Sequence, residues 1–283
     1  MRQSKTRELV ARGAHMLRAA GVDTPEVDAR LLAAWLLDVA PLAVNSTEPA
    51  PNFQVRFAEA IRRRAAREPL QHITGRAPFG PLELAVGPGV FIPRPETEIL
   101  ADWAVRRLTG ASAPVVVDLG TGSGALAIYI AHARDDARVT AVEASATARR
   151  YARANAERLG VNVDVVAGDM TDPALLSELE GRVDLVVSNP PYVPHGPDVG
   201  AEVHHDPYEA VFSGADGMDA IRGLVPVAAR LLAPGGALGI EHDDTTSQLV
   251  QDVLAASGAF SDVEPLDDLT GRARFVTASK VKR

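Results

Sequence analysis

Residues 115–124 read VVVDLGTGSG, a run of valines followed by an acid and then by glycines at alternate positions. A short apolar run bounded by glycine predicts a buried strand. Glycine lets the backbone turn tightly where that strand meets a helix and lets a ligand approach without meeting a side chain. The stretch therefore predicts a ligand-binding turn at the end of a central strand.

Similar apolar runs alternate with amphipathic helical segments along the rest of the chain. We expect strands at 115–117, 139–142, 163–166, 183–187 and 237–240, and helices at 96–108, 125–133, 146–159 and 220–232. Buried strands that alternate with helices indicate an α/β fold with a doubly wound, mainly parallel sheet.

The N-terminal part has a different texture. Residues 1–67 carry apolar side chains at the helical spacing of three and four, and Thr24-Pro25 is a helix-start signal, so we expect a small helical bundle there. Residues 68–95 are interrupted by proline and glycine and contain a short alternating piece, which predicts a linker with a β-hairpin. Residues 96–283 form the α/β domain in this division.

Composition excludes several classes of protein. The 283 residues include no cysteine, which rules out disulfides, thiolate metal sites and cysteine nucleophiles. A net charge of −8 argues against a dedicated nucleic-acid binder. No apolar run has the length of a signal peptide or of a membrane helix, so we expect a cytoplasmic protein.

A run of arginines lies at the end of the predicted helical bundle. We expect it to form a solvated helix face, with a local basic patch as the alternative; its members are Arg62, Arg63, Arg64 and Arg67.

The glycine motif predicts a cofactor site. Its cofactor-binding candidates are Asp118, Gly120, Thr121, Gly122, Ser123 and Gly124, together with Glu143 at the end of the second strand. A carboxylate in the position of Glu143 can accept hydrogen bonds from both hydroxyls of a ribose. The glycines alone also fit a dinucleotide, but a pyrophosphate gains nothing from an anion such as Asp118. The ammonium group of a sulfonium-bearing amino acid can use that anion, which favours a methyl donor.

A second motif, Ser188-Asn189-Pro190-Pro191-Tyr192, follows the fourth strand. Two prolines fix the backbone and remove two amide donors, which leaves a rigid rim of carbonyl oxygens. The side-chain oxygen of Asn189 and the carbonyl of Pro190 can each accept one N–H of a planar NH2 group. Tyr192 can pack on the flat face of that group. The alternative is an ordinary proline-rich turn.

The histidines near this motif are not assigned to chemistry. His204 and His205 are neighbours without a spaced third ligand, so we expect no metal site, and we interpret them and His195 as loop residues. Arg94 and Glu96 are expected either to pair with each other or to face the active site.

The two motifs together resemble the class I methyltransferases that act on planar amino nitrogens. Further segments resemble the release-factor glutamine methyltransferase family, and the resemblance covers nearly the whole chain. They are 68–75 (EPLQHITG), 79–80 (FG), 91–98 (FIPRPETE), 214–217 (GADG) and 232–236 (LAPGG).

The resemblance implies a seven-stranded class I methyltransferase sheet and S-adenosylmethionine as cofactor, with S-adenosylhomocysteine as product. It implies as substrate the glutamine of a Gly-Gly-Gln tripeptide in class I peptide-chain release factors. The helical N-terminal domain would then recognise that partner, and we expect a cytoplasmic monomer that binds no nucleic acid directly.

The family's site residues carry over by position. Asn189, Pro190 and Tyr192 are expected to be catalytic, with Pro191 beside them in the substrate site, and Met170 to lie near the adenine. Asn189 also counts among the cofactor-binding candidates. Glu143 stands where many members have aspartate, and residues 241–244 (EHDD) depart from the usual glycine, which leaves the local loop geometry open.

Three alternatives remain at this point. An amino methyltransferase of another protein, such as a ribosomal protein, or of nucleic acid would use the same chemistry, but no target-recognition region or basic cleft is visible for nucleic acid. A nicotinamide oxidoreductase would leave the double-proline motif unexplained. A non-catalytic binding module would not need an intact reaction motif.

Overall fold

The computed structural model describes residues 5–196, 200 and 202–282. The chain divides into two compact units, Met1–Arg76 with Val199–His205, and Ala77–Asp198 with Asp206–Arg283. Residues 202–205 follow the Asn189 motif in the sequence and are grouped with the first unit.

The first unit is a helical bundle. It contains α1 (Lys5–Ala19), α2 (Pro25–Leu37), the 3-10 helix η1 (Pro41–Ser46), α3 (Phe53–Ala65), the short α4 (Leu70–Thr74) and the 3-10 turn η3 (Val203–His205). Leu17, Leu32, Phe53 and Ile61 are fully buried in its core. Thr24 precedes α2 as predicted, but its hydroxyl donates to Asp28 Oδ1 at 2.8 Å instead of capping a backbone N–H.

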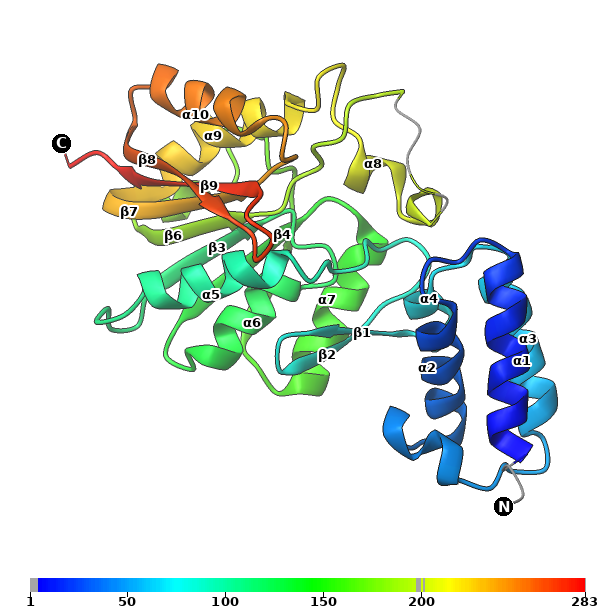
Figure 1. The fold of residues 1–283 in the computed structure, drawn as a ribbon. Helices are drawn as coiled ribbons and strands as arrows, with labels where there is room; N and C mark the ends of the chain where they lie inside the picture. Colours follow the sequence, from blue (N-terminus) through cyan, green and yellow to red (C-terminus); the bar gives the residue numbers. More distant parts are fainter. Residues whose placement is uncertain (1–4, 197–199, 201, 283) are drawn as a thin grey trace. The chain divides into compact units, whose positions relative to one another are not determined.

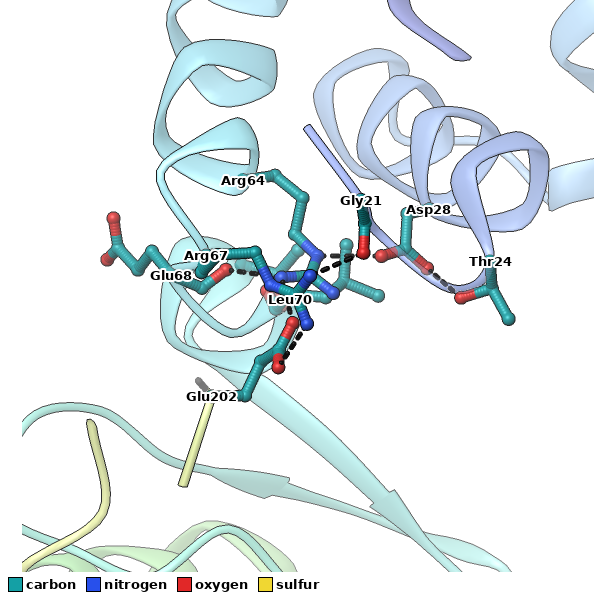
Figure 2. Close-up of polar contacts among 9 residues, drawn as sticks. Gly21, Thr24, Asp28, Arg64, Arg67, Glu68, Leu70 and Glu202 are labelled. Carbon is teal, nitrogen blue, oxygen red and sulfur yellow. Dashed lines mark hydrogen bonds and ion pairs between the residues drawn. The ribbon is translucent and has the colours of Figure 1, made fainter. Parts of the chain in front are cut away.

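The arginine run on α3 is not simply a solvated face, and this corrects the sequence-based expectation. Arg64 is buried, with Nε donating to Asp28 Oδ2 at 2.7 Å and Nη1 donating to Glu202 Oε1 at 3.0 Å. Arg67 Nη2 donates to the other oxygen of Glu202 at 2.7 Å (Figure 2). The sequence did not identify these carboxylates, because Asp28 and Glu202 lie 36 and 138 residues from Arg64.

A hairpin of β1 (Arg76–Phe79) and β2 (Leu82–Ala85) lies within the stretch where the sequence predicts one. Ala85 donates its N–H to Asn155 Oδ1 at 2.7 Å, and Asn155 Nδ2 donates back to the Ala85 carbonyl at 3.0 Å. This two-way bond joins β2 to a buried asparagine of α7 (Ala146–Leu159) within the second unit.

The second unit, whose ribbon is drawn in Figure 1, is built on a seven-stranded sheet. The strand order is β5-β4-β3-β6-β7-β9-β8. The parallel strands are β3 (Val115–Leu119), β4 (Arg138–Glu143), β5 (Val163–Ala167), β6 (Val183–Ser188) and β7 (Leu232–Glu241). The antiparallel strands are β8 (Phe260–Asp267) and β9 (Ala273–Lys280). The predicted α/β fold with a mainly parallel sheet is confirmed.

Helices cover both faces of this sheet. One face is packed by α5 (Thr97–Arg107), α6 (Ala125–Ala133) and α7 (Ala146–Leu159), and the other by α9 (Asp219–Leu231) and α10 (Ser247–Ala256). The short η2 (Ser177–Leu179) precedes β6, and α8 (Tyr208–Val211) lies in the segment that follows it. Val116 and Val117 illustrate the arrangement, since successive side chains of β3 enter the two different cores.

The strand order reverses beside β3. The chain runs outward from β3 to β4 and β5, then crosses to β6 on the other side of β3. In open parallel sheets, ligands bind at such a switch point, outside the carboxyl ends of the strands. Both sequence motifs begin at this place, because residues 118–124 follow β3 and Asn189 follows β6.

Candidate active site

The ends of β3 and β6 are joined directly. Ser188, the last residue of β6, is fully buried and donates its hydroxyl to the carbonyl of Leu119 at 2.6 Å. The bond ties the glycine turn to the double-proline turn, so the two motifs are held at one edge of the sheet.

A cavity of about 900 Å³ opens at this edge. The predicted site residues that line it are Asp118, Gly120, Thr121, Gly122, Ser123, Glu143, Met170, Asn189 and Pro191. Gly124, Pro190 and Tyr192 are absent from its wall. Phe91 and Thr97 from the 91–98 segment also line the cavity, so that segment, both motifs and the end of β4 meet around one space.

Asp118 gives the cavity a buried acceptor. Its Oδ2 accepts hydrogen bonds from the Thr121 hydroxyl at 2.5 Å and from the Ala127 N–H at 3.2 Å, but the buried Oδ1 has no partner. Burial raises the pKa of this carboxyl to about 7. An unsatisfied buried carboxylate oxygen carries a free-energy cost that a cationic donor would remove. The ammonium group of S-adenosylmethionine fits this requirement.

Glu143 has a structural partner that the sequence did not reveal. Its Oε2 accepts the N–H of Gly122 at 2.9 Å and its Oε1 accepts the N–H of Ser145 at 2.8 Å. The carboxylate therefore holds the glycine turn in shape. Each oxygen keeps a second lone pair for a ligand such as a ribose hydroxyl, because a carboxylate can accept about four hydrogen bonds.

Gly120 and Met170 lie against each other on the wall of the cavity. A Cβ atom at Gly120 would stand 2.7 Å from Met170 Cε, and the backbone of Gly120 has a φ of +79°. Both facts explain a glycine at this position. They also leave the thioether of Met170 as an apolar, adaptable surface beside the turn.

Asn189 belongs to a hydrogen-bonded network with residues distant in sequence. Its Nδ2 donates to the hydroxyl of Thr97 at 3.2 Å, and that hydroxyl donates to Glu241 Oε2 at 2.7 Å. Tyr192 donates its hydroxyl to Glu241 Oε1 at 3.1 Å. One oxygen of the Glu241 carboxylate thus holds Tyr192 directly, and the other holds Asn189 through the Thr97 hydroxyl. Sequence reasoning missed Thr97, and it noted Glu241 only as the start of an unusual loop.

Burial dominates the electrostatics of this network. Thr97 and Glu241 are 3% and 1% exposed. Burial raises the pKa of Glu241 to about 7, against the lowering effect of the Thr97 and Tyr192 hydroxyls. Burial and the nearby Glu241 charge raise the pKa of Tyr192 well above its usual value, so Tyr192 stays a neutral donor. A carboxylate at the carboxyl end of β7, next to β6, was the signal that could have identified Glu241.

The backbone after the motif is fixed by the segment 211–217. Val193 donates its N–H to the Val211 carbonyl at 2.9 Å, and Ser213 donates back to the Val193 carbonyl at 2.8 Å. Gly217, at a φ of +77°, approaches so closely that a Cβ there would lie 2.2 Å from the Tyr192 carbonyl oxygen. The GADG segment therefore serves to support the double-proline turn.

The remaining candidates have other partners. His195 contacts the Tyr208 hydroxyl through Nδ1 at 2.7 Å and lies stacked on that ring, while His204 and His205 lie in η3. Arg94 pairs with Asp206 at 2.5 Å, and its guanidinium lies 4.8 Å from the centre of the Phe91 ring. Within the described residues, no group of three or more His, Asp or Glu side chains is placed to hold a metal ion.

Comparison with known proteins places the chain in a family. Residues 8–75 match the family model described as PrmC N-terminal domain, and residues 84–257 match the model described as Methyltransferase small domain. A release factor glutamine methyltransferase of Corynebacterium glutamicum is 56% identical over 94% of this chain and 95% of its own length. This chain belongs to the release factor glutamine methyltransferase family. The Mycobacterium tuberculosis member is 45% identical over 97% of this chain and 91% of its own.

Membership in the release factor glutamine methyltransferase family makes the protein an S-adenosylmethionine-dependent methyltransferase. The nicotinamide oxidoreductase alternative is therefore wrong.

Solved structures bear on the fold alone. A T. thermophilus 16S rRNA N2 G1207 methyltransferase, solved with AdoMet and guanosine, aligns with a TM-score of 0.52 at 23% identity, over 74% of this chain and 50% of that one. A Pyrococcus furiosus methyltransferase aligns with a TM-score of 0.51 at 19% identity, over 71% of this chain and 90% of that one. Both support the methyltransferase fold of the second unit.

Proposed function

We propose that this protein methylates the side-chain amide nitrogen of the glutamine in the Gly-Gly-Gln tripeptide of class I peptide-chain release factors. The observation that carries the proposal is that one cavity is lined both by Asp118, with its unpartnered buried oxygen, and by Asn189. A cationic amino acid and a planar amide can therefore meet in the same space. The names of the relatives indicate that the protein carrying this amide is a release factor.

The donor site consists of groups from the first three parallel strands. Asp118 accepts a hydrogen bond from the ammonium group, and residues 120–124 surround the amino-acid part of the donor. Glu143 accepts hydrogen bonds from the ribose hydroxyls, and Met170 packs on the adenine. The donor supplies a methyl group on a positively charged sulfur and leaves as S-adenosylhomocysteine. None of these contacts needs a metal ion.

The acceptor site orients a weak nucleophile. An amide nitrogen has a delocalised lone pair, so it reacts only when it is held at the right angle and its N–H bonds are polarised. The side-chain oxygen of Asn189, which lines the cavity, accepts one N–H. The family resemblance assigns the second N–H to the carbonyl of Pro190 and the flat face of the amide to Tyr192, although neither residue lines the cavity in this structure. Pro191 closes the rim. The nitrogen becomes strongly acidic as it is methylated, so its proton passes to solvent water without a dedicated base.

The helical unit helps to hold the release factor, and the enzyme acts as a cytoplasmic monomer without binding nucleic acid. A net charge of −8 supports the last point. Within the described part of the chain, no helix has the length and apolar composition that crossing a bilayer requires.

The test is transfer of labelled methyl from S-adenosylmethionine to a purified release factor, with a Gln→Ala variant of its Gly-Gly-Gln tripeptide as control. We expect label on the natural factor and none on the variant. Absence of label from both, by an enzyme that binds the donor, would overturn the proposed substrate. Ribosomal protein and nucleic acid, tested in parallel, would then show whether a different amino nitrogen is methylated.

A further inference from the structure

We propose that Thr97 and Glu241 are positioning residues that set the polarity of the Asn189 side-chain amide, turning its carbonyl oxygen toward the substrate. The inference rests on the proposed function and deepens it, because it names the residues that make Asn189 an acceptor. An asparagine amide is nearly symmetric in shape, and its two ends differ only in whether they donate or accept hydrogen bonds. Something must therefore decide which end meets the substrate.

The orientation of the Asn189 amide is set first by the carboxylate of Glu241. An ionised carboxylate can only accept hydrogen bonds. The Thr97 hydroxyl has a single proton, and it donates that proton to Glu241 Oε2 at 2.7 Å. Toward Asn189, the Thr97 oxygen can then act only as an acceptor. The Asn189 end that faces it must be the NH2 group, at 3.2 Å, and the carbonyl oxygen points away from Thr97.

Burial supports this order while Glu241 is ionised. Glu241 and Thr97 are 1% and 3% exposed, so few water molecules compete for the hydrogen bond between them. The second oxygen of Glu241 is taken by the Tyr192 hydroxyl at 3.1 Å. Thr97 and Asn189 both line the cavity, so the chain of hydrogen bonds leads from a buried anion to the wall where the substrate binds.

The sheet brings the participants together. Ser188, the last residue of β6, lies beside Ile240 of β7 in parallel register. Asn189 directly follows β6, and Glu241 is the last residue of β7. Thr97 is the first residue of α5, and it reaches both from the 91–98 segment. No local sequence pattern joins these three positions, because Asn189 and Glu241 lie 92 and 144 residues after Thr97.

Reversal of Asn189 would place an NH2 group against the NH2 group of the substrate. Two donors repel each other, and the nitrogen that must attack would lose its acceptor. Around metal sites, removal of a group that orients a ligand from behind typically changes activity about 10- to 100-fold. We apply the same scale to Thr97, which orients Asn189 in the same way. We expect a loss of this size in turnover and little change in donor binding.

Thr97→Val and Thr97→Ser form a matched pair for the test. Valine keeps the shape but removes the hydroxyl, whereas serine keeps the hydroxyl. We expect Thr97→Val to lower kcat for release-factor methylation about 10- to 100-fold, with the KM for the factor and the Kd for S-adenosylmethionine changed less than about threefold. Thr97→Ser should restore most of the turnover. Equal kcat values for the two variants would overturn the proposal.

A measurement without turnover keeps the proposal testable if Thr97→Val does not fold. In the wild-type enzyme labelled with 15N-asparagine, Asn189→Asp identifies the Asn189 side-chain signal by its disappearance. We expect one Nδ2 proton to be shifted downfield by the bond to Thr97 and to exchange slowly with solvent. Two freely exchanging protons would overturn the proposal. If the wild type instead fails to label any release factor, the proposed function fails, whatever this spectrum shows.

Discussion

The hydroxyl of Tyr192 donates a hydrogen bond to Oε1 of Glu241 at 3.1 Å, so the polar end of the ring is held by the last residue of β7. If the ring acts by packing on the amide, Tyr192→Phe keeps that surface and loses one hydrogen bond. We expect kcat to fall less than about tenfold in Tyr192→Phe and by a larger factor in Tyr192→Ala. Equal losses in the two variants would assign the role to the hydroxyl.

Asn189→Ala removes the proposed side-chain acceptor for the substrate amide. Loss of one preorganised group that contacts the reacting atoms typically costs about 10²- to 10³-fold in kcat, and we expect that loss here. The Kd for S-adenosylmethionine, measured by calorimetry, should change far less. Asn162→Ala, at an exposed position before β5, is the matched control and should behave as wild type. Near-normal turnover of Asn189→Ala would exclude the role.

Binding of the donor should depend on the ionisation of Asp118. Burial raises the pKa of this carboxyl to about 7, and the neighbouring Glu143 adds to the rise. The ammonium group needs the ionised form, so binding must expel a proton below that pH. We expect affinity to weaken about tenfold per pH unit below 7.

Asp118→Asn should bind the donor weakly and lose this pH dependence, whereas Asp164→Asn, at an exposed position of β5, should keep it. Calorimetry in two buffers of different ionisation enthalpy measures the released proton directly. A donor affinity that is flat across pH 7 in the wild type would contradict the assignment.

The pH dependence of kcat, measured at saturating donor and release factor, should follow the ionisation of Glu241 and not that of Asp118. Burial raises its pKa to about 7, the Thr97 and Tyr192 hydroxyls and Arg274 lower it, and Glu96 raises it. Protonated Glu241 can donate to Thr97 and so reverse the order of the network. We therefore expect kcat to rise as pH increases through about 7, and to be low and flat in Glu241→Gln. A flat wild-type profile, or an unchanged rise in Glu241→Gln, would contradict this prediction.

Arg64 should matter for the stability of the helical unit. Its side chain is 9% exposed and pairs with Asp28 and Glu202, whose side chains are 7% and 27% exposed. Arg64→Ala leaves Asp28 buried without its cation, which typically costs about 3–5 kcal/mol. Arg62→Ala, whose side chain is 64% exposed, should change the free energy of unfolding by less than about 0.5 kcal/mol.

Urea unfolding followed by the fluorescence of Trp35, in a Trp103→Phe background, reports this unit selectively because the chain has only these two tryptophans. Equal midpoints for Arg64→Ala and Arg62→Ala would show that the buried pair does not stabilise the unit.

Elements set by local signals were predicted closely. The bounds of α6 and α7 agree with the expectation, because Gly124 precedes one helix and Ser145 and Gly160 flank the other. The side chain of Ser145 accepts the N–H of Ala148 within the same turn. Such capping interactions are local and can be read from adjacent residues.

Elements without such signals were missed. β8 was missed because it lies at the sheet edge with most of its side chains exposed. β9 is an inner strand, but its apolar run is only the pair Phe275-Val276. The strand expected at 237–240 begins instead at Leu232, and its pairing with β6 contains a register shift near Val183. The Pro-Gly-Gly sequence inside it looks like a turn when neighbouring strands are not considered.

The sequence by itself determined the central parallel strands, the glycine turn after β3 and the double-proline turn after β6, because their signals lie within a few consecutive residues. Only the tertiary structure decided how those turns are supported. Glu143 holds the N–H of Gly122, Glu241 holds Thr97 and Tyr192, and Glu202 holds Arg64. Each of these carboxylates meets partners far away in the chain, and strand order and side-chain burial, which no local pattern specifies, bring them into contact.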